Sequence, residues 1–209
     1  MPAFENLADL QQFVELCQAC GLRQQAERVV FGEGVARSRI VFCGEGPGAD
    51  EDKLGRPFVG RAGQLLDQMM EAMGFSRAVN AYILNVVKCR PPNNRTPTME
   101  ERDTCRPHLE AQLGLIRPVI IVLLGSSAIK TFLGEDARVS RCRGRWQCLP
   151  SGIWAMPTYH PAALLRNPGW KVEAWDDLKK VIDQYRALVD PSHVAPAHPL
   201  SSAAGVQKK

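Results

Sequence analysis

The stretch RIVFCGEGPG, residues 39–48, decides the fold, because it is a short apolar run that ends in a glycine-rich turn. A run of this length that is rich in β-branched and aromatic residues is typical of a buried strand. Similar runs, each followed by a turn and a helical pattern, are AYILNVVKCRPP at 81–92, PVIIVLLGSSA at 118–128 and IWAMPTYHPAA at 153–163. Strands that alternate with helices predict an α/β domain, with a mainly parallel central sheet flanked by helices.

Helical patterns lie between and around these runs. Apolar residues share one face of a segment over 7–17, and Gly21 can terminate that helix. Thr98 and Glu101 have the spacing of a capping box, which predicts that a helix begins between them. A further amphipathic helix is expected over 175–188, near the end of the patterned part of the chain.

Composition limits the class of protein. The chain has 209 residues, of which 45% are hydrophobic and 23% charged, and it has no apolar run long enough to cross a bilayer. These values indicate a single soluble domain over 1–188 and exclude membrane-spanning and collagen-like classes. Residues 189–209 are rich in Pro, Ala and Ser without apolar periodicity, which predicts a disordered tail. The N-terminus lacks the features of a secretory signal, so we expect a cytoplasmic protein without a membrane partner.

Seven cysteines in a reducing compartment favour metal ligation, buried thiols, or both, over a disulfide framework. Cys17 and Cys20 form a C-x2-C pair at the expected end of the first helix, where both sulfurs can reach one metal centre. Cys89 follows a predicted strand and Cys105 lies on the apolar face of a predicted helix, so these two can complete a set of four. Spacing does not separate zinc from an iron-sulfur cluster, and ordinary buried cysteines remain an alternative.

Polar residues at strand ends are the first candidates for function, since ligands bind beyond the carboxyl ends of parallel strands. Asn85 interrupts the run ILNVV, so its amide either bonds to a neighbouring loop in the core or recognises the edge of a nucleobase. His160 follows another run and has Arg166 nearby, which suits either a structural histidine or one that acts on an anionic ligand.

Two loops add candidate residues. The glycine-rich stretch over 44–63 places Glu45 and Glu51 near Phe58, and its glycines permit close approach to a ligand. The loop over 138–146 holds four arginines and a tryptophan, a composition that suits either a solvated surface or contact with nucleic-acid phosphates.

Together these motifs resemble the family 4 uracil-DNA glycosylases, the iron-sulfur branch of that superfamily. The resemblance covers residues 13–185 and rests on the segments GEGPGADED, GRPFVGRAG, NVVKCRPPNNRTP, ERDTCRPHL and TYHPAALLRNP. It implies a single-domain enzyme that binds uracil-containing DNA and hydrolyses the N-glycosidic bond of deoxyuridine. Such an enzyme releases uracil and leaves an abasic site, as the first step of base excision repair.

The resemblance also implies roles for individual residues. Uracil would be bound by Glu45, Gly46, Pro47, Phe58, Asn85 and His160. Catalysis would fall on His160, Glu45 and Glu51, with the water-orienting role on one of the two glutamates. DNA would be contacted by Leu164, Leu165 and Arg166. From the composition of the arginine-rich loop, independently of the resemblance, we expect Arg143 and Arg145 to contact DNA phosphates as well. A 4Fe-4S cluster would be bound by Cys17, Cys20, Cys89 and Cys105.

The sequence also bears on competing functions. A related branch traps the deoxyribose covalently and carries a histidine in a basic insertion, whereas the segment RPPNNRTP over 90–97 has none, so we expect turnover. The alternative is a non-enzymatic or covalently trapping iron-sulfur protein that binds uracil-containing DNA. We expect a monomer, and the sequence specifies no repair or clamp protein as a partner.

Overall fold

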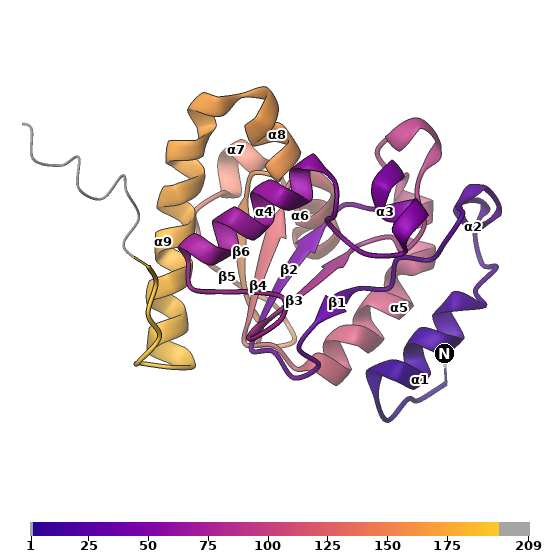
Figure 1. The fold of residues 1–209 in the computed structure, drawn as a ribbon, viewed down its shortest axis with the longest axis horizontal. Helices are drawn as coiled ribbons and strands as arrows, with labels where there is room; N and C mark the ends of the chain where they lie inside the picture. The colour runs from indigo at the N-terminus through magenta and orange to yellow at the C-terminus, as the bar shows by residue number, and fades with distance from the viewer. Residues whose placement is uncertain (1, 197–209) are drawn as a thin grey trace, which may run out of the picture.

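The computed structural model describes residues 2–196, and a central sheet organises this part of the chain (Figure 1). The strand order is β1-β3-β2-β4-β6-β5, with parallel pairing among β3, β2, β4 and β6 and antiparallel pairing at both edges. The strands are β1 (Glu33–Gly34), β2 (Ile40–Gly44), β3 (Ala81–Asn85), β4 (Ile120–Leu124), β5 (Gln147–Cys148) and β6 (Trp154–Thr158). The predicted α/β class with a mainly parallel sheet is therefore confirmed.

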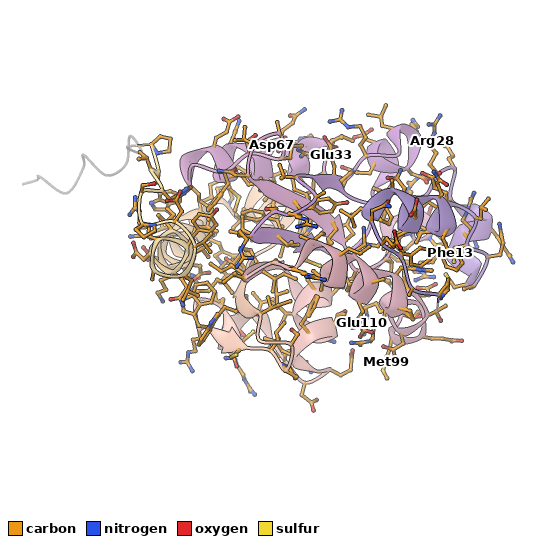
Figure 2. The ribbon with its side chains drawn as sticks, turned by 90° about the horizontal axis from the view of Figure 1, so that it is seen from below. Phe13, Arg28, Glu33, Asp67, Met99 and Glu110 are labelled. Atoms are coloured by element: carbon orange, nitrogen blue, oxygen red, sulfur yellow. The ribbon has the colours of Figure 1, made fainter. Side chains whose placement is uncertain are left out.

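Helices cover both faces of the sheet. The α-helices are α1 (Leu7–Glu15), α2 (Gly21–Gln25), α3 (Ala49–Leu54), α4 (Arg61–Ala72), α5 (Met99–Ile116), α6 (Ser126–Leu133), α7 (Val139–Cys142), α8 (Pro161–Arg166) and α9 (Lys171–Leu188). Short 3-10 helices lie at Pro92–Asn94 and Pro168–Trp170. Helices α4 and α9 pack on one face, whereas α5 and α6 pack on the other. In Figure 1, α9 and α1 lie at opposite ends of the molecule, and Figure 2 shows Phe13 of α1 at the end away from α9.

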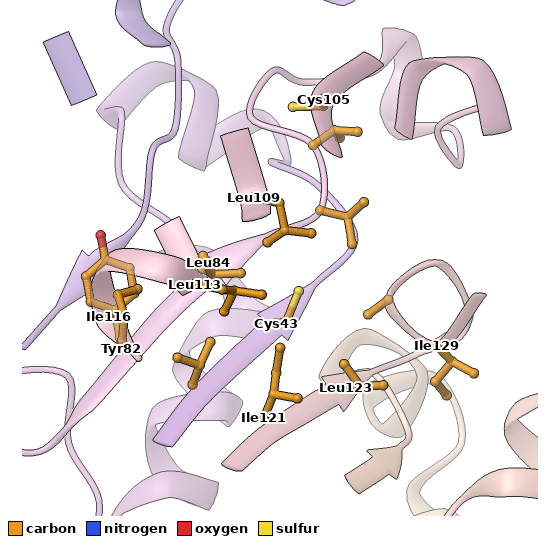
Figure 3. Close-up of a cluster of buried hydrophobic side chains, with 14 of the residues drawn as sticks. Cys43, Tyr82, Leu84, Cys105, Leu109, Leu113, Ile116, Ile121, Leu123 and Ile129 are labelled. Carbon is orange, nitrogen blue, oxygen red and sulfur yellow. The ribbon is translucent and has the colours of Figure 1, made fainter. Parts of the chain in front are cut away.

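The strands carry side chains for two separate cores. All five residues of β2 are buried, and they alternate between the faces, with Ile40 and Phe42 on the α4–α9 side and Val41 and Cys43 on the α5–α6 side. Figure 3 shows the second of these clusters, with Cys43 among leucine and isoleucine side chains from strands and α5. Burying a large aliphatic or aromatic side chain contributes about 1.5–3 kcal/mol. Burial on both faces explains why the strands are continuous apolar runs.

The expected helix starts and ends are partly corrected. The capping box of α5 is present, since Thr98 accepts from the Glu101 N–H and the Glu101 carboxylate accepts from the Thr98 N–H. The first helix ends earlier than predicted, at Glu15, and Gly21 begins α2 instead of terminating α1. A small third core consists of Leu10, Val14 and Phe31, and α1 contributes only the first two of these residues. The apolar pattern therefore did not show where α1 ends.

The segment after α9 also differs from the expectation. Residues 189–196, the start of the predicted disordered tail, pack on the domain. His193 is 8% exposed, stacks on Phe75 at a centroid distance of 4.5 Å, and donates a hydrogen bond to the Met73 carbonyl at 2.8 Å. A single aromatic anchor has no sequence periodicity, so pattern analysis missed it. The remainder of the tail prediction, 197–209, lies outside the described residues.

Within 2–196, no helix has both the length and the apolar character needed to span a membrane.

Candidate active site

Four parallel strands end at one edge of the sheet, where a cleft of about 690 Å³ opens. Asn85 is the last residue of β3, Glu45 and Gly125 directly follow β2 and β4, and His160 lies just beyond β6. The predicted site residues that line this cleft are Glu45, Gly46, Pro47, Glu51, Phe58, Asn85, His160 and Arg166. The sheet therefore brings together most of the residues that the sequence pointed to.

Asn85 supplies a buried amide at the cleft. Its residue exposure is only 2%, and its Oδ1 is buried without a hydrogen-bond partner among the described residues. Leaving such an acceptor unsatisfied costs about 1–3 kcal/mol. A Cβ added to Gly44 would lie 2.5 Å from this oxygen and 2.4 Å from Phe58 Cζ. Glycine at this position therefore lets the amide, the phenyl ring and the β2 backbone approach one another closely.

His160 has a defined tautomer. Its Nδ1 accepts a hydrogen bond from the Ala162 N–H at 3.1 Å, which caps α8, so the ring hydrogen of the neutral imidazole is on Nε2. Desolvation lowers the pKa of His160 to about 4, and the nearby Arg166 charge acts in the same direction. At neutral pH, His160 is therefore an uncharged hydrogen-bond donor through Nε2. A Cβ on Gly125 would come within 2.8 Å of the His160 Cβ, so this glycine permits the close packing.

Phe58 faces His160 from the glycine-rich loop. The two rings stack with centroids 5.6 Å apart at 30°, and Phe58 is 6% exposed. Its φ of 54° lies in the left-handed region, which costs of order 1–3 kcal/mol for a side chain of this size. Arg77 holds this conformation by donating to the carbonyls of Pro57 at 2.7 Å and Phe58 at 2.9 Å. The strained backbone is thus fixed from outside the cleft.

The two glutamates have different surroundings. Glu51 Oε1 accepts from the N–H groups of Val59 and Gly60, each at 2.9 Å, and its Oε2 accepts from Gly48 N–H at 3.1 Å. Both Glu51 oxygens therefore hold the loop. Glu45 instead accepts from the hydroxyl of Ser127 through Oε2, at the start of α6.

Only some of the residues predicted to contact DNA are exposed. Leu164 is 1% exposed and packs inside the protein, whereas the adjacent Leu165 is 37% exposed. Arg145 is exposed, but the Arg143 side chain is only 20% exposed, and its guanidinium donates to Asp177 Oδ1 at 2.9 Å. Leu164 is therefore too buried to insert into the DNA base stack, and the Arg143 guanidinium already has a carboxylate partner instead of being available for a DNA phosphate.

Some residues of the cleft were not found from the sequence. The cleft is also lined by Arg61, Arg95, Tyr159 and Trp170. Ser127 positions Glu45 by donating its hydroxyl hydrogen to the carboxylate. Ser127 had a signal, because it lies two residues after the glycine that ends a predicted strand. Tyr159 also had a signal as the immediate neighbour of His160. Trp170 had none, because its 3-10 helix lies far from any predicted strand end.

The four predicted ligand cysteines line a second, much smaller pocket of about 20 Å³. Cys17 and Cys20 lie in the connection between α1 and α2, with Cys20 as the N-cap of α2, so the predicted shared helix face is wrong. Cys105 lies on α5 with 8% exposure, as predicted. Burial raises the pKa of Cys89 to about 12, and the neighbouring Cys105 acts in the same direction. All four are free thiols.

The kind of ligand atom at this pocket suits a metal centre. Among residues 2–196, no group of three His, Cys, Asp or Glu side chains is already arranged to hold a metal ion. The four cysteines nevertheless line one pocket. Thiolates bind both zinc and iron-sulfur clusters, so this set of residues fits either kind of centre.

The fold and the cleft define a class of protein. A parallel sheet whose strand ends carry a buried unsatisfied amide, a neutral histidine and a stacked phenylalanine is suited to hold a flat, hydrogen-bonding ring.

Comparison with known proteins narrows this class. Residues 31–179 match the family described as the Uracil DNA glycosylase superfamily. A type-4 uracil-DNA glycosylase of Thermotoga maritima is 50% identical over 164 residues, which cover 78% of this chain and 85% of that protein. Type-4 enzymes of Sulfurisphaera tokodaii and Archaeoglobus fulgidus are 43% and 41% identical, each over 85% of this chain and over 84% and 92% of their own lengths. The chain belongs to the uracil-DNA glycosylase superfamily and, within it, to the type-4 family.

Proposed function

We propose that this protein is a monofunctional uracil-DNA glycosylase, which hydrolyses the N-glycosidic bond of deoxyuridine in DNA and leaves an abasic site. The observation that carries the proposal is the unsatisfied Oδ1 of Asn85 in the cleft. The names of the type-4 relatives support the same reaction.

Asn85 gives the cleft a preference for uracil over cytosine. Uracil presents an N3–H donor beside its O4 acceptor, so Asn85 Oδ1 accepts from N3–H while Nδ2 donates to O4. Cytosine has an acceptor and an amino group at those positions, which would place like groups against the amide. Phe58 covers the ring face, and such stacking contributes about 1–3 kcal/mol per base.

His160 stabilises the leaving group. When the bond between C1′ and N1 breaks, its electron pair stays on uracil and negative charge develops at O2. The neutral His160 donates a hydrogen bond from Nε2 to that oxygen, because its lowered pKa prevents it from acting as a cationic acid. Uracil therefore leaves as an anion.

Glu45 is the carboxylate that we assign to the sugar side. Its negative charge favours the cation-like deoxyribose, and it accepts a proton from the water whose oxygen bonds to C1′. Ser127 orients it through the hydroxyl hydrogen bond. Glu51 takes a supporting role, since its oxygens are engaged by loop N–H groups.

Extrusion of the base from DNA costs free energy, which contacts between the protein surface and DNA must offset. The deoxyuridine leaves the base stack at a cost of a few kcal/mol. Arg166 at the cleft and exposed Arg145 are suited to phosphate contact, and exposed Leu165 to the space the base vacates. We further propose that the protein acts as a cytoplasmic monomer.

The cysteine pocket extends the proposal to a cofactor. We infer that Cys17, Cys20, Cys89 and Cys105 bind a 4Fe-4S cluster, supported by their common pocket and their free thiols. A bound cluster supplies iron–thiolate bonds that connect the α1–α2 connection to α5 and to the segment after β3.

Incubation with matched oligonucleotides, one with uracil and one with thymine, followed by alkaline cleavage, tests the activity. We expect strand cleavage at uracil only. Intact DNA in both reactions would refute the proposed enzyme, and a protein–DNA adduct that survives denaturation would favour the covalently trapping alternative.

A further inference from the structure

Three flat groups are stacked at the rim of the cleft, on the side of β6. The rings of Tyr159 and Trp170 are nearly parallel, with an interplanar angle of 15° and centroids 4.8 Å apart. The guanidinium carbon of Arg143 lies 5.1 Å from the centroid of the Tyr159 ring. Arg143 therefore belongs to the base of this stack, in place of the predicted role on DNA phosphates.

Acidic residues of α9 hold the stack in place. Tyr159 donates its hydroxyl to Glu173 Oε2 at 2.7 Å. Arg143 donates to Asp177 Oδ1 at 2.9 Å, and Asp177 Oδ2 accepts from the Thr158 hydroxyl at 2.7 Å. Because Thr158 ends β6, these bonds connect Tyr159 and Arg143 to the sheet, and the Trp170 ring stacks on the tyrosine ring that they hold. Positions fixed in this way lose little entropy when a ligand binds.

Trp170 is the outer member of the stack. It lines the cleft together with Tyr159 and Arg166, yet it is 40% exposed. Indole is among the most costly side chains to leave in water, and its π-face accepts any nucleobase by stacking. A partly exposed indole beside the cleft, stacked on a tyrosine ring that is itself hydrogen-bonded, is a surface for a second planar group.

We propose that Trp170 is a stacking platform for the nucleobase next to the extruded deoxyuridine, on the same DNA strand. This inference rests on the proposed function. When the uracil leaves the helix, its neighbour loses a stacking partner, and the exposed face of Trp170 replaces that partner. The contact depends on a planar base but not on which base it is, so it strengthens binding without sequence preference.

A binding cycle tests the platform. The probes are single-stranded oligonucleotides with a 2′-fluoro analogue of deoxyuridine, which resists cleavage, and with the neighbouring base either present or replaced by an abasic spacer. The spacer is placed on the 5′ side in one probe and on the 3′ side in another. We expect one spacer position to weaken binding by the wild-type protein by about tenfold. Strands with thymine in place of the analogue measure binding to the spacer alone.

Variants separate stacking from other effects. Trp170→Ala should weaken binding to the intact strand by the same factor and lose its response to the spacer, whereas Trp170→Phe should recover part of both. Val172→Ala is the matched control, because Val172 is 69% exposed near Trp170 but does not line the cleft. It should bind and respond as the wild type does. Circular dichroism and thermal unfolding check that each variant is folded.

Two results would overturn the platform. One is a wild-type protein that is indifferent to both spacer positions, and the other is a Trp170→Ala variant that still responds to the spacer as the wild type does. Either result leaves the proposed function intact if the wild-type protein still cleaves uracil-containing DNA. Failure of that cleavage refutes the enzyme and is read in a separate assay.

Discussion

The base cleft and the cysteine pocket are held together in different ways. In the cleft, Glu51 binds three backbone N–H groups of the glycine-rich loop and Arg77 binds two carbonyls next to Phe58. Around the cysteine pocket, α2 has only five residues, and its N-cap, Cys20, makes no side-chain capping bond. The protein's own hydrogen bonds therefore preorganise the cleft, whereas we expect the cysteine region to depend more on what its thiols bind.

The largest expected effect comes from breaking the cysteine region. Cys105→Ser should remove the cluster from protein that otherwise carries about four irons per chain, and proteases should then cut within residues 17–30. Structural metal sites can contribute on the order of 10 kcal/mol, so the local loss is large. Iron analysis and limited proteolysis measure both effects. Cys148→Ser is the control, because Cys148 is exposed and does not line the pocket. Full iron content in Cys105→Ser, or zinc in the wild type, would contradict the cluster.

The next effect tests the chemistry in the cleft. His160→Ala removes the Nε2–H donor and should lower the single-turnover cleavage rate by about 10²–10³, with a much smaller change in affinity for uncleaved DNA. Rapid-quench cleavage and equilibrium binding give the two quantities. A variant that loses binding but keeps the wild-type cleavage rate would make His160 a positioning residue.

The pKa of His160 predicts a dependence of stability on pH. The imidazole titrates near 6.5 when unfolded and near 4 when folded, so the unfolded state binds more protons between these values. Stability should therefore fall as the pH is lowered from about 6.5 to about 4, by up to about 3 kcal/mol. Urea unfolding at both ends of this window, in wild type and in His160→Gln, isolates the histidine. Equal losses in the two proteins would show that His160 is not responsible.

The smallest effect distinguishes the two glutamates. In Glu51→Gln, the amide oxygen can keep the bonds to Val59 and Gly60, but the amide nitrogen faces the Gly48 N–H, so one bond is lost. We expect a loss of about 1 kcal/mol in the free energy of unfolding and a cleavage rate within tenfold of wild type. Glu45→Gln should show the reverse, with a larger loss of rate than of stability. If Glu51→Gln instead loses much of the cleavage rate while its free energy of unfolding is unchanged, then Glu51, and not Glu45, orients the water.

The sequence predicted the strand ends well, because each buried strand is a continuous apolar run followed by a turn. Asn85 and His160 were found for that reason. Contacts between distant segments were not predictable in the same way. Nothing near Arg143 in the sequence indicates that Asp177, on another helix, will bind it. Leu164 and Leu165 are equally apolar neighbours, and only the orientation of a short helix decides which one is buried.

The four cysteines were the right set to single out as neighbours, although the geometric reason given for one pair was wrong. A C-x2-C spacing brings two sulfurs together in a turn as well as on a helix, so the pair does not report its own secondary structure. Cys20 occupies the N-cap position of α2, a helix that the pattern had not predicted.

Gly44 gives the cleft an evolutionary constraint. The main chain of β2 approaches Phe58 and Asn85 so closely that even one methyl group at residue 44 would displace them. Because backbone forms this boundary, its shape cannot be adjusted by exchanging a side chain there. A descendant of this protein that came to accept a bulkier lesion would have to change the side chains on the other sides of the cleft. Gly44, at the end of β2, would stay as it is.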